Sequence, residues 1–423
     1  MKLFQQMLAA GATLSMIAPI GAQASDINIE GMNSYLRNNS SSKKQFNSKT
    51  FSKEITTLNK SVDNLENRMN VLEAGGFSDT TVMDGKAVFD IGAINYDLTD
   101  SAAEALQFAY SYTLNLNSSF TGDDNLYVRI KTGNHGGWMV STDDGGYLSS
   151  VGKNDGALNI DKIWYQFSVG DNNTVWVGPK IENYYMHGTA PSIYKPITKQ
   201  FALGGNGNAY GASTDTGAGW AYKADNGFAI SSNIGTKSKT TNGETGLLTN
   251  ESKTSWATQI GYTQPQYSAS VIVNQKYNGW TDGYYHTAEA DDALVTGGNH
   301  TAIGLRGWWR PEETGSIAPS ISLGFDTTQY DGTNNLHPSD SSYAWFVGMM
   351  WQDMVSADDK IGLAFGKPTS HAHEGDEPFA YELYYSYQAN DSVTITPTIF
   401  GGTNREAPND DVFGALVQTT FKF

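Results

Sequence analysis

Cysteine is missing from this 423-residue sequence, which excludes both a disulfide framework and a thiolate metal site. Long apolar runs are missing too: beyond residue 24 no stretch reaches the ~18 apolar residues of a membrane-spanning helix. Positive charge is scarce, and the net charge of −17 argues against a nucleic-acid partner. We find no G-x-S-x-G, P-loop or H-E-x-x-H motif, so the sequence predicts no enzyme, no cofactor and no metal site.

Glycine, aromatic residues and alternation are what the sequence has in quantity. It contains 45 glycines, and Phe, Trp and Tyr make up 12% of its residues. From residue 77 onward, apolar residues recur at every second position; for example, Leu126, Val128 and Ile130 alternate with Arg129 and Lys131. This period of two predicts strands with one apolar and one polar face. We therefore expect an all-β fold for residues 77–423.

The turns between these strands fall into two classes that alternate along the chain. Seven short turns contain the usual turn residues Gly, Asp, Asn and Pro, as in GDNN (170–173) and ADNG (224–227). Eight longer connections separate them, of which 183–214 is the longest. Seven short and eight long connections join about sixteen strands. Short turns at one end, long loops at the other and an even strand count are typical of a transmembrane β-barrel.

The last strand, VFGALVQTTFKF, shows how such a barrel would face its surroundings. Phe421 and Phe423 lie on its apolar face, and small or polar residues lie on the other. In a soluble sandwich the apolar face would point inward. In a barrel it points to lipid, and the sheet must close because lipid offers no hydrogen bonds to a free edge. We expect a closed antiparallel barrel whose final strand, with Phe423 at the periplasmic rim, completes the wall and carries the assembly signal.

Residues 1–76 have a different character. Residues 1–24 read as a signal peptide, with an apolar stretch and an A-x-A cleavage site, and 25–50 as a flexible Ser/Asn/Lys linker. Residues 51–76 carry an apolar repeat with a/d spacing, which predicts an oligomerising coiled coil. The alternative is one amphipathic helix lying on the β domain. The repeat consists of Ile55, Leu58, Val62, Leu65, Met69 and Leu72.

Several stretches resemble a known family. DDVFGALVQTTFKF, NDSVTITPTIFGG and AWFVGMMWQDMVSADDKIGLAFGKP are similar to the C-terminal strands of carbohydrate-selective, OprB-type porins. The order signal peptide, coil, barrel is similar to cyanobacterial outer-membrane porins described as iron-uptake porins. The resemblance implies an outer-membrane location, a homotrimer and a water-filled lumen. Those relatives carry a cell-wall-binding surface-layer-homology domain before the coil; residues 25–50 are too short for one, and DINIEGMNSYL resembles a remnant.

The resemblance also assigns a pore constriction to the third long loop, 183–214, because in general porins this loop folds inward. An alternative is that the loop only caps the mouth. If the apolar face of each strand points to lipid, the basic residues on the opposite face point into the lumen. Each of them either tunes selectivity or forms an ion pair with the opposite wall. The loop residues are Lys195, Lys199, Tyr184, Tyr185 and Tyr194, and the strand residues are Arg129, Lys131, Lys162, Lys180 and Arg306.

Most carboxylates fall in the long loops, which predicts an acidic outer mouth above a basic constriction. The sequence does not say which of the two dominates selectivity. Within HAHEGDE, His371 and His373 with three carboxylates suggest a divalent metal site, but a solvated acidic loop is the preferred interpretation. The loop carboxylates are Asp143, Asp144, Glu289, Asp291, Asp292, Glu374, Asp376, Glu377 and Asp410.

Two functions are consistent with this pattern. The first is an outer-membrane porin that passes small hydrophilic solutes, such as sugars and inorganic ions including iron, by diffusion. The second is a structural anchor that tethers the outer membrane to the cell wall through the N-terminal coil. Ionic current through a bilayer would distinguish them, because a plugged anchor carries none.

Overall fold

The computed structural model describes residues 80–96, 105–211, 214–237, 246–247, 249–291, 298–331, 341–371, 374–405 and 410–423. The contacts divide the chain into two units, Met1–Val82 and Met83–Phe423, and the strands lie in the second unit apart from residues 81–82. The expected signal peptide, linker and coil lie outside the described residues, as do Asp292 and His373. The proposed boundary at residue 77 also falls there and stays a prediction. In the part of the chain that the structure describes, no helix is both long and apolar enough to span a membrane.

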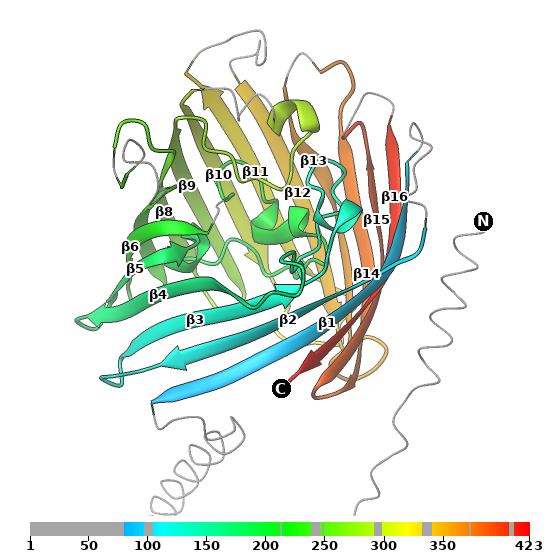
Figure 1. The fold of residues 1–423 in the computed structure, drawn as a ribbon, viewed down its shortest axis with the longest axis horizontal. Coiled ribbons are helices and arrows are strands. Elements are labelled where there is room, and N and C mark those ends of the chain that lie inside the picture. Colours follow the sequence, from blue (N-terminus) through cyan, green and yellow to red (C-terminus); the bar gives the residue numbers. More distant parts are fainter. Residues whose placement is uncertain are drawn as a thin grey trace, which may run out of the picture. The chain divides into compact units, whose positions relative to one another are not determined.

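Sixteen antiparallel strands form a single closed barrel, in which each strand pairs with its neighbour in sequence and β16 pairs with β1 (Figure 1). This confirms the predicted all-β barrel. The strands are β1 (Thr81–Tyr96), β2 (Gln107–Ser118), β3 (Asp124–Gly133), β4 (Asn159–Val169), β5 (Asn173–Ile181), β6 (Asp215–Lys223), β7 (Phe228–Thr236), β8 (Thr254–Thr263), β9 (Tyr267–Tyr277), β10 (His300–Trp309), β11 (Ser320–Tyr330), β12 (Ser341–Gln352), β13 (Lys360–His371), β14 (Phe379–Asn390), β15 (Val393–Thr403) and β16 (Asp411–Lys422).

The final strand closes the barrel as expected. β16 pairs with β1 over eleven positions, from Lys86↔Lys422 to Tyr96↔Val412. Beyond the last pair, the backbone N–H of Gly85 donates to the carbonyl of Phe423 at 2.8 Å, and that of Phe423 donates back at 3.1 Å. The ring of Phe423 stacks on Tyr112 of β2, with 5.6 Å between centroids. The C-terminal residue thus belongs to the seam that converts an open sheet into a barrel without edges.

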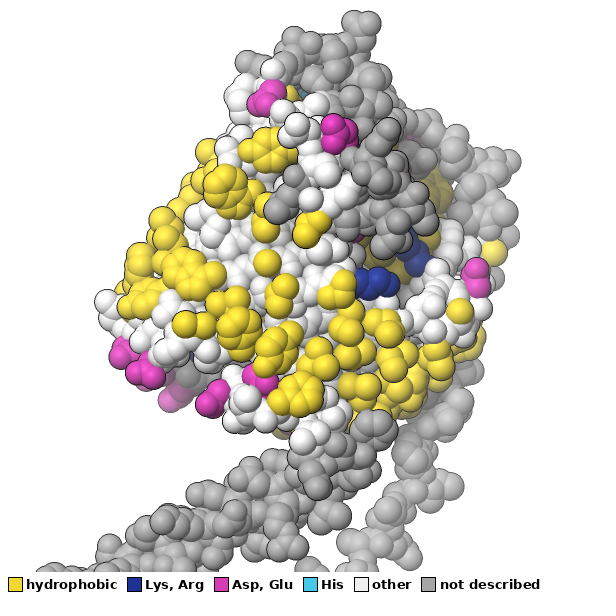
Figure 2. Space-filling view, turned by 60° about the vertical axis from the view of Figure 1, so that its left-hand side comes forward, with side chains coloured by type: hydrophobic (Ala, Val, Ile, Leu, Met, Phe, Trp, Pro, Cys, Tyr) yellow, Lys and Arg dark blue, Asp and Glu magenta, His cyan; other side chains and the backbone are white. Residues whose placement is uncertain are grey.

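Side chains alternate across the wall as the sequence pattern indicates. On β10, Ile303, Leu305 and Trp309 are exposed on the outer face, while Ala302 and Arg306 are buried on the inner one. Several other strands, such as β8, β9 and β11, repeat this pattern, and apolar side chains gather on the outer surface seen in Figure 2. The outer face is the expected lipid-facing one. Its exposed aromatic members include Phe89, Phe108, Trp220, Phe228, Trp256, Tyr262, Tyr267, Phe325, Tyr343, Phe379, Tyr387 and Phe413.

The inside of the barrel differs from the expectation of a water-filled middle. The described residues of connections 134–158, 182–214 and 278–299 pack against the inner face of β12–β16 and bury a shared apolar core there. Trp138 stacks on Phe400 with 5.6 Å between ring centroids, and Phe201 lies 5.9 Å from Phe346. Short helical segments of these connections lie within the ring of strands (Figure 1). One side of the interior is therefore dry, because apolar inner residues of the late strands are covered by loops.

Candidate functional site: the interior of the barrel

The β5–β6 connection, residues 182–214, crosses the interior and returns. It begins with a 3₁₀ turn, η3 (Asn183–Met186), beside β5 to β7. The N–H of Thr189 then donates to Gln259 of β8 at 2.9 Å, and the N–H of Ile193 to Ser322 of β11 at 3.1 Å. These contacts place the connection inside the barrel, in agreement with the prediction that it folds inward. Its role as a constriction remains a prediction.

Glu382 of β14 fixes the far end of this crossing. Its side chain is fully buried on the inner face. It accepts hydrogen bonds from Tyr194 Oη at 2.9 Å, Ile197 N at 3.2 Å, Thr198 N at 2.6 Å and Thr198 Oγ1 at 2.7 Å. A buried carboxylate is costly unless its oxygens are satisfied, and these four donors satisfy them. Glu382 therefore ties the crossing loop to the wall opposite the strands from which the loop starts.

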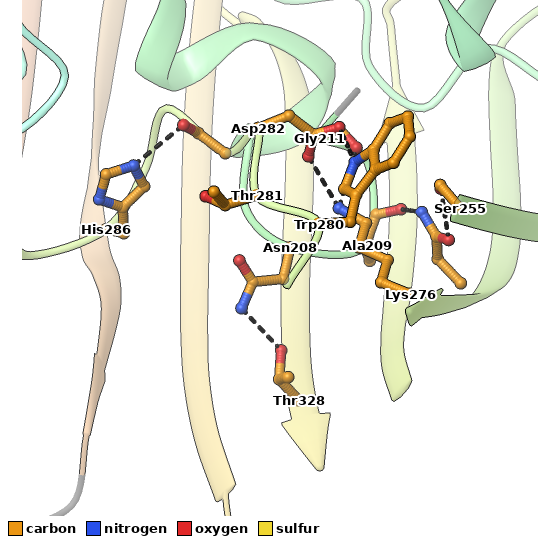
Figure 3. Close-up of polar contacts among 12 residues, drawn as sticks. Asn208, Ala209, Gly211, Ser255, Lys276, Trp280, Thr281, Asp282, His286 and Thr328 are labelled. Carbon is orange, nitrogen blue, oxygen red and sulfur yellow. Dashed lines mark hydrogen bonds and ion pairs between the residues drawn. The ribbon is translucent and has the colours of Figure 1, made fainter. Parts of the chain in front are cut away.

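The returning limb is fixed by polar side chains of β9 to β11 (Figure 3). Lys276 Nζ donates to the carbonyl of Gly211 at 3.1 Å and to Asp282 Oδ1 at 2.8 Å. Asn208 Nδ2 donates to Thr328 Oγ1 at 3.0 Å. Trp280 Nε1 also donates to Asp282. A fully buried lysine is paired here with a buried aspartate, so the contact is structural and presents no free charge.

Arg405, in the β15–β16 connection, joins the three inward connections. It is 1% exposed. Its Nε donates to the carbonyl of His286 at 2.9 Å, Nη1 to Gln200 Oε1 at 2.6 Å and Nη2 to the carbonyl of Thr142 at 3.2 Å. Burial lowers the pKa of Arg405 to about 10, which leaves it charged at neutral pH. One guanidinium fork thus holds connections 134–158, 182–214 and 278–299 together.

A cavity of about 480 Å³ remains on the other side of the interior, next to β3–β5. We call it the loop-side cavity, because its lining comes from the loop-side ends of these strands and from the long connections. Basic side chains are visible in a hollow of the surface in Figure 2. The charged and aromatic lining residues are Arg129, Lys131, Lys153, Lys162, Lys180, Lys199, Asp161, Glu182, Tyr147, Tyr184 and Tyr284.

Two of the six basic residues of this cavity are ion-paired. Arg129 of β3 pairs with Asp161 of β4, and Lys162 pairs with Glu182. Tyr184 donates its hydroxyl to the same Glu182; burial raises the pKa of Tyr184 well above its usual range, so it stays a donor at neutral pH. Arg129 and Lys162 are thus ion-paired, but with partners on neighbouring elements and not on the opposite wall as the alternative supposed.

The other basic residues of the cavity have no carboxylate within ion-pair distance among the described residues. Lys180 Nζ donates to the carbonyl of Ile160 at 2.9 Å. Lys199 Nζ lies 4.0 Å from the ring centroid of Tyr284, a cation–π contact. Burial lowers the pKa of Lys199. Lys131 of β3 also lines the cavity. Three of the predicted lumen lysines therefore meet in one space without a carboxylate partner among the described residues.

Lys195 lies elsewhere. It lines a second cavity, of about 470 Å³, together with Arg310, Glu312, Glu313 and Lys360. Apart from Lys195, these residues lie in or beside the short β10–β11 and β12–β13 connections, so we call it the turn-side cavity. The sequence interpretation grouped Lys195 with Lys199 because both lie in the long loop 183–214. The structure separates them, since the loop descends to the turn side at Lys195 and rises again by Lys199.

Three further predicted lumen residues are held in packing contacts, Arg306 and Tyr194 buried and Tyr185 partly buried. Arg306 of β10 points inward but is 4% exposed, and donates to Asp326, to the carbonyl of Leu203 and to that of Gly205. Tyr194 is buried against Glu382. Tyr185 packs on Trp164, with 4.4 Å between centroids. These side chains fix the loop to the wall and do not line open space, which corrects the expectation that they face the lumen.

The outer mouth carries fewer exposed carboxylates than the sequence suggests. Asp144 and Asp410 are buried, and Tyr96 Oη donates to Asp144 at 2.5 Å. Burial raises the pKa of Asp144 to about 6. Glu374 accepts the N–H of His371 at 2.6 Å. Six predicted mouth carboxylates keep partial or full exposure: Asp143, Glu289, Asp291, Glu374, Asp376 and Glu377.

HAHEGDE is not wholly an exposed loop. His371 belongs to the end of β13 and is 2% exposed, which corrects the expectation for this residue. Asp376 and Glu377 are exposed, and Glu377 pairs with Lys367 at 3.0 Å. Within the described ranges no three His, Asp or Glu side chains converge in a way that could hold a metal ion.

A buried cluster of Ser150, His135 and Asp90 has the residue types of a hydrolase site but not its arrangement. Ser150 Oγ and His135 Nε2 both bond to Asp90 Oδ2, each at 2.9 Å. Gln418 Nε2 donates to the other oxygen of Asp90 at 2.8 Å. A nucleophilic serine needs its own bond to the base, whereas here serine and histidine share the acid. The cluster therefore ties connection 134–158 to β1 and β16.

The sequence interpretation missed the partners of the basic residues. Asp161 and Glu182 neutralise Arg129 and Lys162, and Tyr147 and Tyr284 face each other with 4.8 Å between centroids beside Lys199. Glu382 was visible as a carboxylate among the inward-facing residues of its strand. A charge on an otherwise small or aromatic inner face was the signal that could have identified it as a loop anchor.

Comparisons with known proteins agree with this architecture. No family model matches the chain. An uncharacterized protein of Nostoc sp. is 23% identical over 88% of this chain and 70% of its own length, and one of Synechocystis sp. is 24% identical over 88% and 74%. The structure of Pseudomonas putida OprB is similar with a TM-score of 0.60 at 11% identity, covering 84% of this chain and 96% of that one. Salmonella typhi OmpF gives 0.51 at 10% identity, covering 81% and 97%. At these identities the likeness concerns the fold, and at that level the resemblance to OprB-type barrels is confirmed.

Proposed function

We propose that this chain is an outer-membrane porin through which small hydrophilic solutes diffuse without energy input. The observation that carries the proposal is the combination of a closed sixteen-stranded barrel, an apolar outer face and a charged cavity inside. An apolar outside with a polar, loop-narrowed inside is what a passive pore requires. The likeness of the fold to OprB and OmpF supports the same function.

The route of solutes follows from where the interior is not packed. Connections 134–158, 182–214 and 278–299 fill the side next to β12–β16. Passage is therefore expected along β3–β5, through the loop-side cavity. Connection 182–214 forms the inner wall of this route and acts as the constriction. Sugars and inorganic ions, including iron, are the expected solutes; the hydroxyl and amine donors of the walls suit sugars and anions.

Location and assembly belong to the same proposal. Residues 1–24 would direct export to the outer membrane, and the a/d repeat of 51–76 would join three chains in the periplasm. Replacing Val62 and Leu65 together by Asp places charge in that seam. The variant should run as a smaller species in detergent if the coil holds a trimer, while Ser61→Asp, outside the a/d positions, should not change the size.

Conductance of the purified full chain in a planar bilayer tests the function. A porin gives stepwise increases of current that persist at low voltage. Glu382→Gln should increase the step size, because the amide NH₂ cannot accept the hydrogen bonds of one carboxylate oxygen, which weakens the loop's anchor and widens the route. A preparation that forms a correctly folded barrel by circular dichroism, yet gives no current for either form, would contradict a passive pore.

A second function is favoured by the packed half of the interior. A barrel whose lumen is filled by loops can serve as an anchor, with the N-terminal segment contacting the cell wall. Cell-wall sedimentation of the full chain and of a chain lacking residues 25–76 separates the two functions. Loss of sedimentation in the truncated chain, together with absence of current in the full one, would favour the anchor.

A further inference from the structure

The loop-side cavity carries an excess of positive charge that its own carboxylates do not balance. Its lining includes six basic and two acidic side chains. Both acids are already engaged, Asp161 with Arg129 and Glu182 with Lys162. The remaining basic side chains, none of them paired with a carboxylate of the described residues, are Lys131, Lys153, Lys180 and Lys199. Because like charges in a confined, partly desolvated space repel each other, this arrangement is stabilised by a counter-charge.

The side chains around these lysines offer donors. Each ammonium group has three N–H donors and no acceptor, and the tyrosines of the lining present hydroxyl groups. Lys199 is kept in place by the ring of Tyr284, at 4.0 Å, and Lys153 lies 5.4 Å from the ring of Tyr147. A volume of about 480 Å³ is of the size of small-molecule sites. The cavity can therefore surround one small anion with donors from several elements.

We propose that the loop-side cavity is a binding site for small oxyanions, of which inorganic phosphate is the simplest, and that it makes the pore anion-selective. This rests on the proposed function for the passage itself and adds the class of solute. The turn-side cavity mixes Lys195, Arg310 and Lys360 with Glu312 and Glu313, so its charges are more nearly balanced. The sign of the selectivity is set on the loop side.

The type of basic residue also says how the anion is recognised. Arginine would bind an oxyanion in a bidentate fork, but the Arg129 side chain is occupied by Asp161, with Nε 2.5 Å from Oδ2. The cavity's remaining cations are all lysines, which act as point charges and impose little geometry. The site therefore selects for negative charge more than for shape. Phosphate, sulfate and carboxylates should all bind, and a neutral sugar of the same size should bind less well.

Two measurements on the full chain test this. In a potassium chloride gradient across a planar bilayer, the reversal potential should show preference for chloride of roughly tenfold, the low end of the enrichment that charged clefts produce. Inorganic phosphate at millimolar concentration should reduce the chloride current. Lys131→Gln/Lys199→Gln should bring the preference close to unity and weaken the phosphate effect. Lys195→Gln, the same substitution in the same loop but in the turn-side cavity, should leave both nearly unchanged.

Calorimetric titration of phosphate into the detergent-solubilised chain separates this inference from the proposed function. A chain that carries no current but binds phosphate, with binding lost in the double variant, would overturn the porin function and retain the anion site. A conducting chain that prefers potassium would overturn the inference and retain the porin. Equal phosphate affinity in wild type and in a folded double variant would overturn the inference as well.

Discussion

Arg129 and Asp161 face each other inside the barrel, with Arg129 Nε 2.5 Å from Asp161 Oδ2. A β-bulge between β3 and β4 makes this possible: Arg129 pairs with Lys162 and Ile130 with Ile160, so Asp161 is the extra residue. Strict alternation would place Asp161 on the same face as Ile163, toward the outside. The bulge turns it inward, and an extra residue of this kind is a common way to re-aim a side chain next to a functional site.

The Arg129–Asp161 pair predicts a charge effect on selectivity. Asp161→Asn should increase chloride preference, because the Arg129 charge is no longer balanced, and Arg129→Gln should decrease it. Each change should be about threefold, the effect of one unit charge about 7 Å from an ion path in water. The double variant is charge-neutral and should return near the wild-type reversal potential. Identical reversal potentials for all four proteins would place the ion path away from this pair.

Loss of the Glu382 contacts should free the crossing loop. In Glu382→Gln an amide replaces the carboxylate that accepts from Tyr194, Ile197 and Thr198. Leaving buried backbone donors unsatisfied should weaken the anchoring by about 2–4 kcal/mol. Cleavage within 182–214 by an added protease should become faster, while the circular dichroism spectrum of the barrel stays unchanged. Glu377→Gln is the control, since Glu377 is exposed; equal cleavage of the two variants would be evidence against the anchoring role.

His187 predicts a loosening of the same connection in acid. Its ring is buried edge-on to Tyr210, and burial lowers its pKa to about 4. The unfolded segment binds the proton near its ordinary pKa of 6.5, so the packed state is at full stability above that pH. Its stability falls as the pH decreases from about 6.5 to about 4, by about 3 kcal/mol in total.

The rate of protease cleavage in 182–214, measured between about pH 7 and pH 4, checks this. It should increase toward low pH in the wild type and change less in His187→Gln, whose side chain does not titrate. Asp144 acts in the opposite direction, because burial raises its pKa to about 6. The stability that its protonated form gives to the packed state is lost as the pH rises. A variant whose pH profile matched that of the wild type would rule out His187 as the cause.

Phe423 should contribute to closure in two separable ways. Phe423→Ala removes the ring that stacks on Tyr112 but keeps the backbone bonds to Gly85, at a cost of about 1 kcal/mol. Deletion of Phe423 removes the two backbone bonds as well, and should cost about 3 kcal/mol. Urea unfolding of the refolded barrel measures both. If Phe423 also acts as an assembly signal, Phe423→Ala should reduce the yield of folded barrel in cells more strongly than its small effect on stability explains.

The architecture of the wall could be predicted from local sequence patterns. Alternation of apolar and polar residues shows which face of each strand points outward, since the period of side chains along a strand is two. The alternation of short turns and long loops shows the number and direction of the strands. Both are local properties, so they can be read without the fold. The same alternation predicts that Lys131, Lys162 and Lys180 point inward, and all three line the loop-side cavity.

The contents of the barrel depend instead on contacts between distant parts of the chain. Whether a lumen lysine is free or paired depends on residues from other elements, as for Lys162 with Glu182, and on a bulge that local alternation does not reveal. Lys195 and Lys199 are four residues apart, yet line different cavities because the loop that carries them is tied to Glu382, 184 residues beyond Thr198. Burial of the loops against β12–β16 likewise results from long-range contacts, and these contacts leave the remaining space beside the lysines of β3–β5.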